Sequence, residues 1–163
     1  MKRNFFIIVL ILSLLFFCGC GPRYIIKSDP PIQKVNTDSY SIELNPVGYY
    51  GYTGFVLMIE NKTEKDIELI WDKTYYLNND ATSGGFMFEG IVYKDRNNPK
   101  PPDVIFPKTK LIKTIWPNNL VSFSNGWYNS PMPDGDNGIY VTLNVNGKET
   151  REKLTVKLFR ESL

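Results

Sequence analysis

Apolar and polar residues alternate along much of the chain after residue 39, which is the pattern of strands with one buried face. The alternation is clear at 40–44 and again at 67–71. Residues 54–59 are nearly all apolar and too few for a helix, so we expect a central strand covered on both faces there. Further strands are expected at 74–77, 86–88, 90–93, 110–115 and 120–123. No window of a dozen residues has a clear 3.6-residue period, which predicts little helix.

A hairpin is expected near the C-terminus, where apolar residues alternate on both sides of Asn146-Gly147. Asn-Gly is the preferred sequence of a two-residue type I′ turn. A loop of only these two residues places Ile139 opposite Leu154, so that the apolar sets of both strands share one side of the ribbon. Because the residues from Lys148 to Glu152 put polar side chains on that same face, we expect the tip to project beyond the core into water.

The predicted fold is all-β. Many short strands separated by clusters of Gly, Pro, Asn and Asp favour an immunoglobulin-like antiparallel β-sandwich over an α/β fold, with a small β-barrel as the alternative. The disulfide of immunoglobulin domains is missing, and the immunoglobulin comparison is therefore an analogy. Trp71 and Trp116 lie on or at the end of predicted strands, so both are expected to be buried.

The first residues have the features of a secretory signal. A basic start is followed by 13 residues, 5–17, of which only Ser13 is polar. As a helix this run spans about 20 Å, whereas a bilayer core is about 30 Å thick. The run is therefore too short to favour a transmembrane anchor.

The run ends in Phe17-Cys18-Gly19-Cys20, which resembles the lipobox of bacterial lipoproteins. The aliphatic first position of that motif is Phe here, which is a departure. The resemblance implies a diacylglyceryl thioether on Cys20, cleavage before it and acylation of the new amino terminus, and three acyl chains make a permanent membrane anchor. Gly21, in place of the Asp that retains such proteins at the inner membrane, implies sorting to the outer membrane in a Gram-negative host. The alternative is an ordinary cleaved signal followed by a free thiol.

The predicted boundaries are therefore a signal peptide at 1–19, a lipidated N-terminus and flexible tether at 20–38, and one β-sandwich domain at 39–163. Two prolines at 30 and 31 and only short apolar pairs support the tether. Fully extended it reaches about 60 Å, which would let the domain stand clear of the bilayer. The alternative is that residues 24–26 join the sheet as a first strand.

Charge and composition argue against several functions. Removal of residues 1–19 takes away two of the 19 basic residues, which leaves 17 against 17 acidic ones, so we expect no nucleic-acid partner. Histidine is absent and no thiol remains once Cys20 is lipidated, which argues against triad catalysis, catalytic zinc and any cofactor beyond the covalent lipid. The chain is thus predicted not to be an enzyme.

A carboxylate pair of the glycosidase kind depends on the distance between two side chains, which a sequence does not contain. The plausible members are scattered and have no companion motif: Glu60, Asp66, Asp72 and Glu89.

Three tyrosines next to glycines, Tyr49, Tyr50 and Tyr52, are the candidate partner-binding residues, because exposed Tyr and Trp clusters bind proteins or glycans. The pair Trp127-Tyr128 raises the same question. Asn61-Lys62-Thr63 matches a glycosylation sequon but is read as a polar turn.

Two loops contain residues typical of binding sites. Residues 133–138 hold two carboxylates and an amide, the oxygen ligands of calcium, but lack the third position and the distant Glu, so an acidic turn without metal is expected. The proline-rich loop 95–103 is interpreted as a rigid crossover between two sheets, with docking on an aromatic groove as the alternative.

Together these features predict a membrane-anchored envelope lipoprotein whose domain binds an envelope protein or glycan. An inhibitor or immunity factor is the alternative within binding proteins, and a carboxylate-based hydrolase of envelope glycan is the alternative among enzymes.

Overall fold

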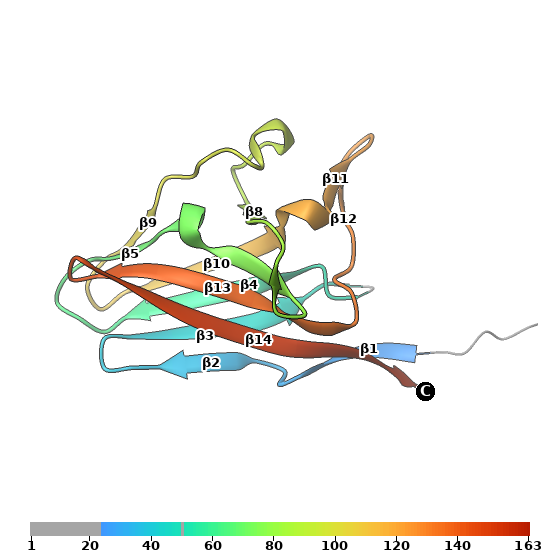
Figure 1. The fold of residues 1–163 in the computed structure, drawn as a ribbon, viewed down its shortest axis with the longest axis horizontal. Coiled ribbons are helices and arrows are strands. Elements are labelled where there is room, and N and C mark those ends of the chain that lie inside the picture. Colours follow the sequence, from blue (N-terminus) through green and yellow to red (C-terminus); the bar gives the residue numbers. More distant parts are fainter. Residues whose placement is uncertain (1–23, 50) are drawn as a thin grey trace, which may run out of the picture.

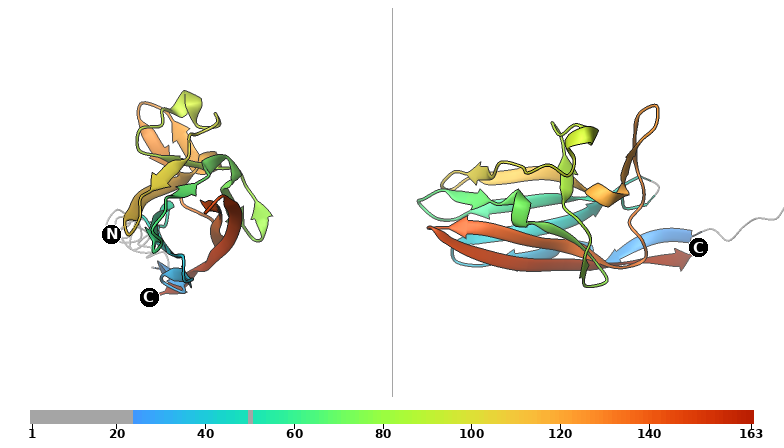
Figure 2. Two further views of the ribbon diagram at one scale, coloured as in Figure 1. Left: turned by 90° about the vertical axis from the view of Figure 1, so that its left-hand side faces the viewer. Right: turned by 45° about the horizontal axis from the view of Figure 1, so that its top comes forward.

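The computed structural model describes residues 24–49 and 51–163, which form an all-β sandwich of two antiparallel sheets (Figure 1). The view along the long axis shows the sheets as two layers facing one another (Figure 2, left). They remain separate sheets, so the sandwich is confirmed and the small barrel is not the architecture. Among the described residues no helix has the length and apolar character needed to cross a membrane.

The first sheet, sheet A, has seven strands. Five follow the order β1-β14-β13-β5-β9, while β6 pairs with β13 and β7 with β6. Their bounds are β1 (Tyr24–Asp29), β5 (Ile67–Leu69), β6 (Tyr75–Asn78), β7 (Ala81–Thr82), β9 (Asp103–Ile105), β13 (Gly135–Val145) and β14 (Lys148–Ser162).

The second sheet, sheet B, has the order β2-β3-β4-β10-β8, and a separate two-stranded ribbon is formed by β11 and β12. Their bounds are β2 (Gln33–Asn36), β3 (Tyr40–Val47), β4 (Gly54–Asn61), β8 (Phe86–Phe88), β10 (Lys110–Pro117), β11 (Val121–Phe123) and β12 (Trp127–Asn129). Three short 3₁₀ turns complete the described chain: η1 (Trp71–Lys73), η2 (Tyr93–Asp95) and η3 (Asn118–Leu120).

The core lies between the two sheets and is made by the apolar residues of the alternating pattern. On β4, which lies inside sheet B, Phe55, Leu57 and Ile59 are fully buried. The intervening Val56 and Met58 are only half-buried, so the outer face of this strand is not covered as fully as its apolar sequence predicts.

The C-terminal hairpin is confirmed in its register. Ile139 pairs with Leu154, and the turn residues Asn146 and Gly147 have φ of 53° and 80°, as a type I′ turn requires. The turn and the two residues after it are exposed. Further along β14 the polar part of the core-facing side is covered by the opposite sheet, because the Tyr40 hydroxyl donates a hydrogen bond to Glu152 Oε1 at 2.7 Å.

The prediction of a flexible tether at 20–38 is wrong for the part of that segment that the structure describes. Residues 24–29 form β1, which pairs along its whole length with β14, and residues 33–36 form β2, which pairs with β3. The alternative of a first strand is therefore the correct one, and residues 24–38 belong to the sandwich together with those from 39 onward. Both strands are at sheet edges and are only partly buried, so their apolar pattern is weak, and their stability comes from backbone pairing.

The segment after β8 also differs from expectation. The strand predicted at 90–93 is wrong: residues 89–90 form a turn in which Gly90 has φ of 91°, and Tyr93 is already the first residue of η2. The rest of the segment is the expected crossover, since it links β8 in sheet B to β9 in sheet A. The Lys100 backbone N–H donates to Asp72 Oδ1 at 2.8 Å, and burial lowers the pKa of the Lys100 ammonium while Asp72 opposes that shift.

Of the two tryptophans expected in the core, only Trp71 is buried. Its indole N–H donates to Asp103 Oδ2 at 2.9 Å, and Lys113 pairs with the same carboxylate at 2.5 Å. Trp116 is half-buried. It lies against Gly54, where a Cβ atom would come within 2.7 Å of the Trp116 ring.

The Asn61-Lys62-Thr63 turn is held by hydrogen bonds of the Asn61 side chain to the backbone. The Asn61 side chain is fully buried and donates to the carbonyls of Lys65 and Ile105 at 2.7 and 2.8 Å. Its oxygen accepts the backbone N–H of Thr63 at 2.9 Å. This confirms the polar turn, and the buried amide is not accessible to a glycan.

Candidate functional site

The ribbon β11–β12 stands out from the sandwich in both side views (Figures 1 and 2). Phe123 pairs with Trp127 across a turn in which Asn125 has φ of 54° and the Ser124 N–H donates to the Gly126 carbonyl. Two strands alone are marginally stable in water. The ribbon therefore depends on contacts with its neighbours, among them the bond from the Ser130 N–H to the Leu120 carbonyl at 2.8 Å.

Three aromatic rings provide the most extensive of these contacts, and we call them the aromatic cluster: Tyr93, Phe123 and Trp127. The Trp127 ring centroid lies 5.7 Å from those of both Tyr93 and Phe123, in edge-to-face geometry. Such pairs are favoured beyond their buried area. The Arg96 guanidinium lies over the Tyr93 ring, 4.0 Å from its centroid. The rings are thus held in place although Phe123 and Trp127 remain more than half exposed.

Beside Trp127 lies a cleft of about 400 Å³, which we call the aromatic cleft. Its walls come from β8 with the turn after it, from Trp116 near the end of β10, from Val121 at the start of β11, and from β12. The lining residues are Met87, Phe88, Glu89, Gly90, Ile91, Trp116, Val121, Trp127 and Asn129. An apolar cleft of this size with a few polar groups is the usual form of a binding site for a small group.

A polar pocket of about 350 Å³ adjoins the aromatic cleft at Val121. Its side chains include Arg96, Asn97, Asn118 and Asn119. The Asn118 amide donates to the Arg96 carbonyl at 2.7 Å, which holds the crossover against η3. The two hollows together offer an apolar and a hydrogen-bonding region to one ligand.

The predicted tyrosine patch is present in part. Tyr49 is 89% exposed, Tyr52 is half-buried against the core, and Tyr50 lies outside the described residues. Tyr49 and Tyr52 line a shallow hollow together with the start of β1. The tight turn requires glycine at position 48, where a Cβ atom would come within 1.8 Å of the Gly51 carbonyl oxygen.

The acidic loop uses its polar groups within the fold. Asp134 pairs with Arg160 at 3.3 Å, and the buried Asn137 amide donates to the carbonyls of Pro133 and Gly135. The oxygen of Asn137 accepts the hydroxyl of Tyr76, which is also buried. In the described ranges no group of three His, Cys, Asp or Glu side chains lies close enough together to hold a metal ion.

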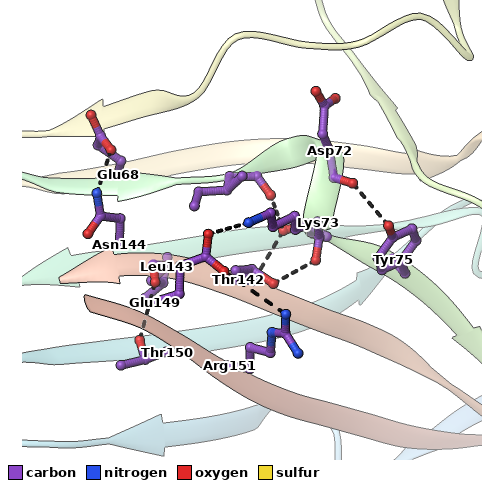
Figure 3. A network of polar contacts seen from close by, with 12 residues as sticks. Glu68, Asp72, Lys73, Tyr75, Thr142, Leu143, Asn144, Glu149, Thr150 and Arg151 are labelled. Atoms are coloured by element: carbon purple, nitrogen blue, oxygen red, sulfur yellow. Dashed lines mark hydrogen bonds and ion pairs between the residues drawn. The ribbon is translucent and has the colours of Figure 1, made fainter. Parts of the chain in front are cut away.

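A polar network joins η1 to β13 and β14 of sheet A (Figure 3). Glu149 pairs with Lys73, and that hydrogen bond lowers the pKa of the Glu149 carboxyl. Below it the buried Thr142 hydroxyl donates to the Lys73 carbonyl at 2.6 Å, and its N–H donates to Thr74 Oγ1 at 3.2 Å. These bonds fasten η1 to β13, so the network supports the fold.

The four carboxylates considered for catalysis are on different elements. Glu60 lies on β4, Asp66 before β5, Asp72 in η1 and Glu89 after β8. Of the four, Glu89 lines the aromatic cleft and Asp72 accepts the Lys100 N–H. The structure therefore does not gather them into one site.

The aromatic cluster joins residues that the sequence analysis treated separately or left aside. The pair Trp127-Tyr128 was noted, but Tyr93 had been assigned to a strand. Tyr93 lies in η2, before the prolines of the crossover, and its contact with Phe123, 30 residues further along the chain, has no local signal in the sequence. Cys20, the predicted lipidation site, lies outside the described residues.

Comparison of the chain with family models, with curated proteins and with solved structures finds no match.

Proposed function

We propose that this chain is a lipid-anchored protein of a bacterial cell envelope, in the outer membrane where the host has one, that binds an envelope protein or glycan and catalyses no reaction. This location is supported by the basic start, the short apolar run and the lipobox-like residues that end in Cys20. Binding is supported by the aromatic cleft.

The observation that carries the binding proposal is the state of Trp127. Its ring is 52% exposed at the edge of an apolar cleft, yet Tyr93 and Phe123 hold it in a defined position. A rigid, exposed ring loses little entropy when a partner covers it, and Trp side chains are prominent among residues that dominate binding energy. An apolar side chain or the apolar face of a sugar fits such a surface.

A second candidate function, an inhibitor or immunity factor, is favoured by the protruding ribbon. β11–β12 projects from the sandwich with exposed Phe123 near its tip (Figures 1 and 2). A braced hairpin of this kind has the shape needed to enter the cleft of an incoming enzyme or toxin.

The hydrolase alternative lacks comparable support. Glycosidases need two carboxylates about 5 to 9.5 Å apart in a pocket. The aromatic cleft has one carboxylate in its lining, Glu89, and the polar pocket and the hollow beside Tyr49 have none.

The test is photo-crosslinking in intact cells with a photoreactive phenylalanine derivative at Asn129, which lines the aromatic cleft on the same face of β12 as Trp127. We expect a defined adduct whose yield falls at least about tenfold in Trp127→Ala, since central aromatic residues contribute about 2 kcal/mol or more to binding. Tyr75→Ala, an exposed tyrosine on sheet A, is the matched control and should leave the yield unchanged.

An adduct that persists in Trp127→Ala would contradict binding at the cleft. The adduct's mass separates a protein from a glycan, and a captured enzyme or toxin that is inactive in the complex would favour the inhibitor. Cys20→Ser tests the anchor, because the variant should leave the membrane fraction; retention there would contradict lipidation.

A further inference from the structure

The end of the sandwich where β1 begins has a concentration of exposed apolar and aromatic side chains, which we call the anchor-side end: Tyr24, Ile25, Tyr49 and Leu163. Their exposed fractions are 52%, 39%, 89% and 78%. The start of β1 and Tyr49 line one hollow, and Tyr24 pairs with Ser162 next to the C-terminus. These residues therefore form one surface from three parts of the chain.

Figure 1 places the start of β1 and the C-terminus at one end of the long axis and the β13–β14 turn at the other. β14 alone has 15 residues, which corresponds to about 50 Å at 3.3 Å per residue. The anchor-side end and the Asn146-Gly147 turn are thus at opposite ends of the molecule.

The distance from the predicted lipid to this end is short. Cys20 precedes Tyr24 by four residues, and a chain of that length spans at most about 15 Å. Because residues 24–29 are a strand of the sandwich and not a tether, the start of β1 stays within that distance of the lipid-bearing residue. It is much smaller than the length of the sandwich.

From these observations we infer that the anchor-side end is a membrane-contact surface, with Tyr24, Ile25 and Tyr49 in the headgroup region of the bilayer. The inference rests on the proposed function, because it requires the lipid on Cys20. It replaces the expectation that the domain stands clear of the membrane. One end of the sandwich then lies at the bilayer, and the other end is directed away from it.

The chemistry of the surface fits lipid headgroups. Tyrosine has an apolar ring and a polar hydroxyl, and it is enriched where membrane meets water. Two nearby cations of the described residues are paired, since Lys27 binds Glu161 and Arg160 binds Asp134, and the Arg160 guanidinium also lies 5.1 Å from the centroid of the Tyr24 ring. The contact therefore relies on rings and apolar groups, and it should not depend on anionic lipid.

The experiment uses the full lipidated protein in vesicles, with an environment-sensitive fluorophore on a single introduced cysteine. The lipidated chain has no other thiol, because Cys18 leaves with the signal and Cys20 carries the lipid. Tyr49→Cys reports the anchor-side end and Lys148→Cys the opposite end. Ile112→Cys, 65% exposed on β10, reports a molecule lying on its side.

We expect nitroxide lipids to lower the emission at position 49 at least about twofold, because side chains in the headgroup region lie within about 10 Å of the acyl boundary. Emission at 112 and 148 should change little. The pattern should be the same in phosphatidylcholine vesicles and in vesicles that also contain phosphatidylglycerol.

Mass spectrometry of the same samples separates the two proposals. Equal quenching at 49, 112 and 148, or none at 49, in a protein that carries the acyl mass would overturn the membrane-contact surface and leave the anchor intact. A mature chain without acyl mass would overturn the anchor and this inference together.

Discussion

Burial changes the chemistry of individual side chains in this sandwich, and Tyr76 shows it best. Its ring is fully buried, its hydroxyl donates to Asn137, and burial raises its pKa to about 12. Tyr40 is affected in the same direction by burial and then by the Glu152 carboxylate that accepts its hydroxyl. The folded state therefore holds these protons at a pH where an unfolded chain releases them.

We predict that the free energy of unfolding falls as pH rises from about 10 to 12, by about 1.4 kcal/mol per pH unit for one such group. The sign follows because the unfolded state binds fewer protons in that window. Tyr76→Phe should be less stable at pH 8 by about 1 kcal/mol, for the lost hydrogen bond, and should depend less steeply on alkaline pH. Urea unfolding at several pH values measures both.

Tyr75→Phe is the matched control, because Tyr75 is next in sequence but 40% exposed, and its hydroxyl bonds the Asp72 carbonyl at 3.1 Å. Its pH profile should match the wild type. An unchanged profile in Tyr76→Phe would show that Tyr76 does not carry the effect.

At the scale of elements, local sequence decides the hairpins. In the β13–β14 turn Gly147 has φ of 80° and no atom within 4 Å of a Cβ at that position, so only backbone conformation restricts the residue there. Glycine adopts this left-handed region without strain and Asn tolerates it, whereas other residues rarely adopt it.

Gly147→Val should therefore lower the free energy of unfolding by about 1–2 kcal/mol, measured by urea unfolding. Gly147→Asn serves as the control and should lose clearly less, because Asn tolerates positive φ. Equal losses in both variants would contradict a conformational cause.

At the scale of the whole molecule, the first and the last described strands pair with each other. β1 pairs with β14 from Tyr24 with Ser162 to Asp29 with Lys157, so the first described strand depends on the last residues of the chain. This arrangement also turns a predicted tether into part of the sheet, and it sets the short reach to Cys20.

Removal of residues 159–163 takes away the β14 partners of residues 24–27. We expect those amides of residues 24–27 that are hydrogen-bonded to β14 to lose protection from hydrogen exchange, measured by mass spectrometry, while β3 keeps its protection inside sheet B. Removal of Leu163 alone is the control and should leave β1 protected. Protection of β1 in the longer truncation would mean that another contact holds it.

The sequence by itself determined the all-β class, most of the strands of the core, the C-terminal turn with its register, and the lipobox-like leader on which the proposed address depends. These features are local: alternation, turn residues and an apolar run are complete within a few neighbours. Only the tertiary structure decided that residues 24–29 are a strand, that Tyr93 joins Phe123 and Trp127 beside a cleft, and that Tyr49 lies near the start of β1. Each of these depends on pairing between distant segments, where backbone bonds and ring contacts form without a signal in either segment alone.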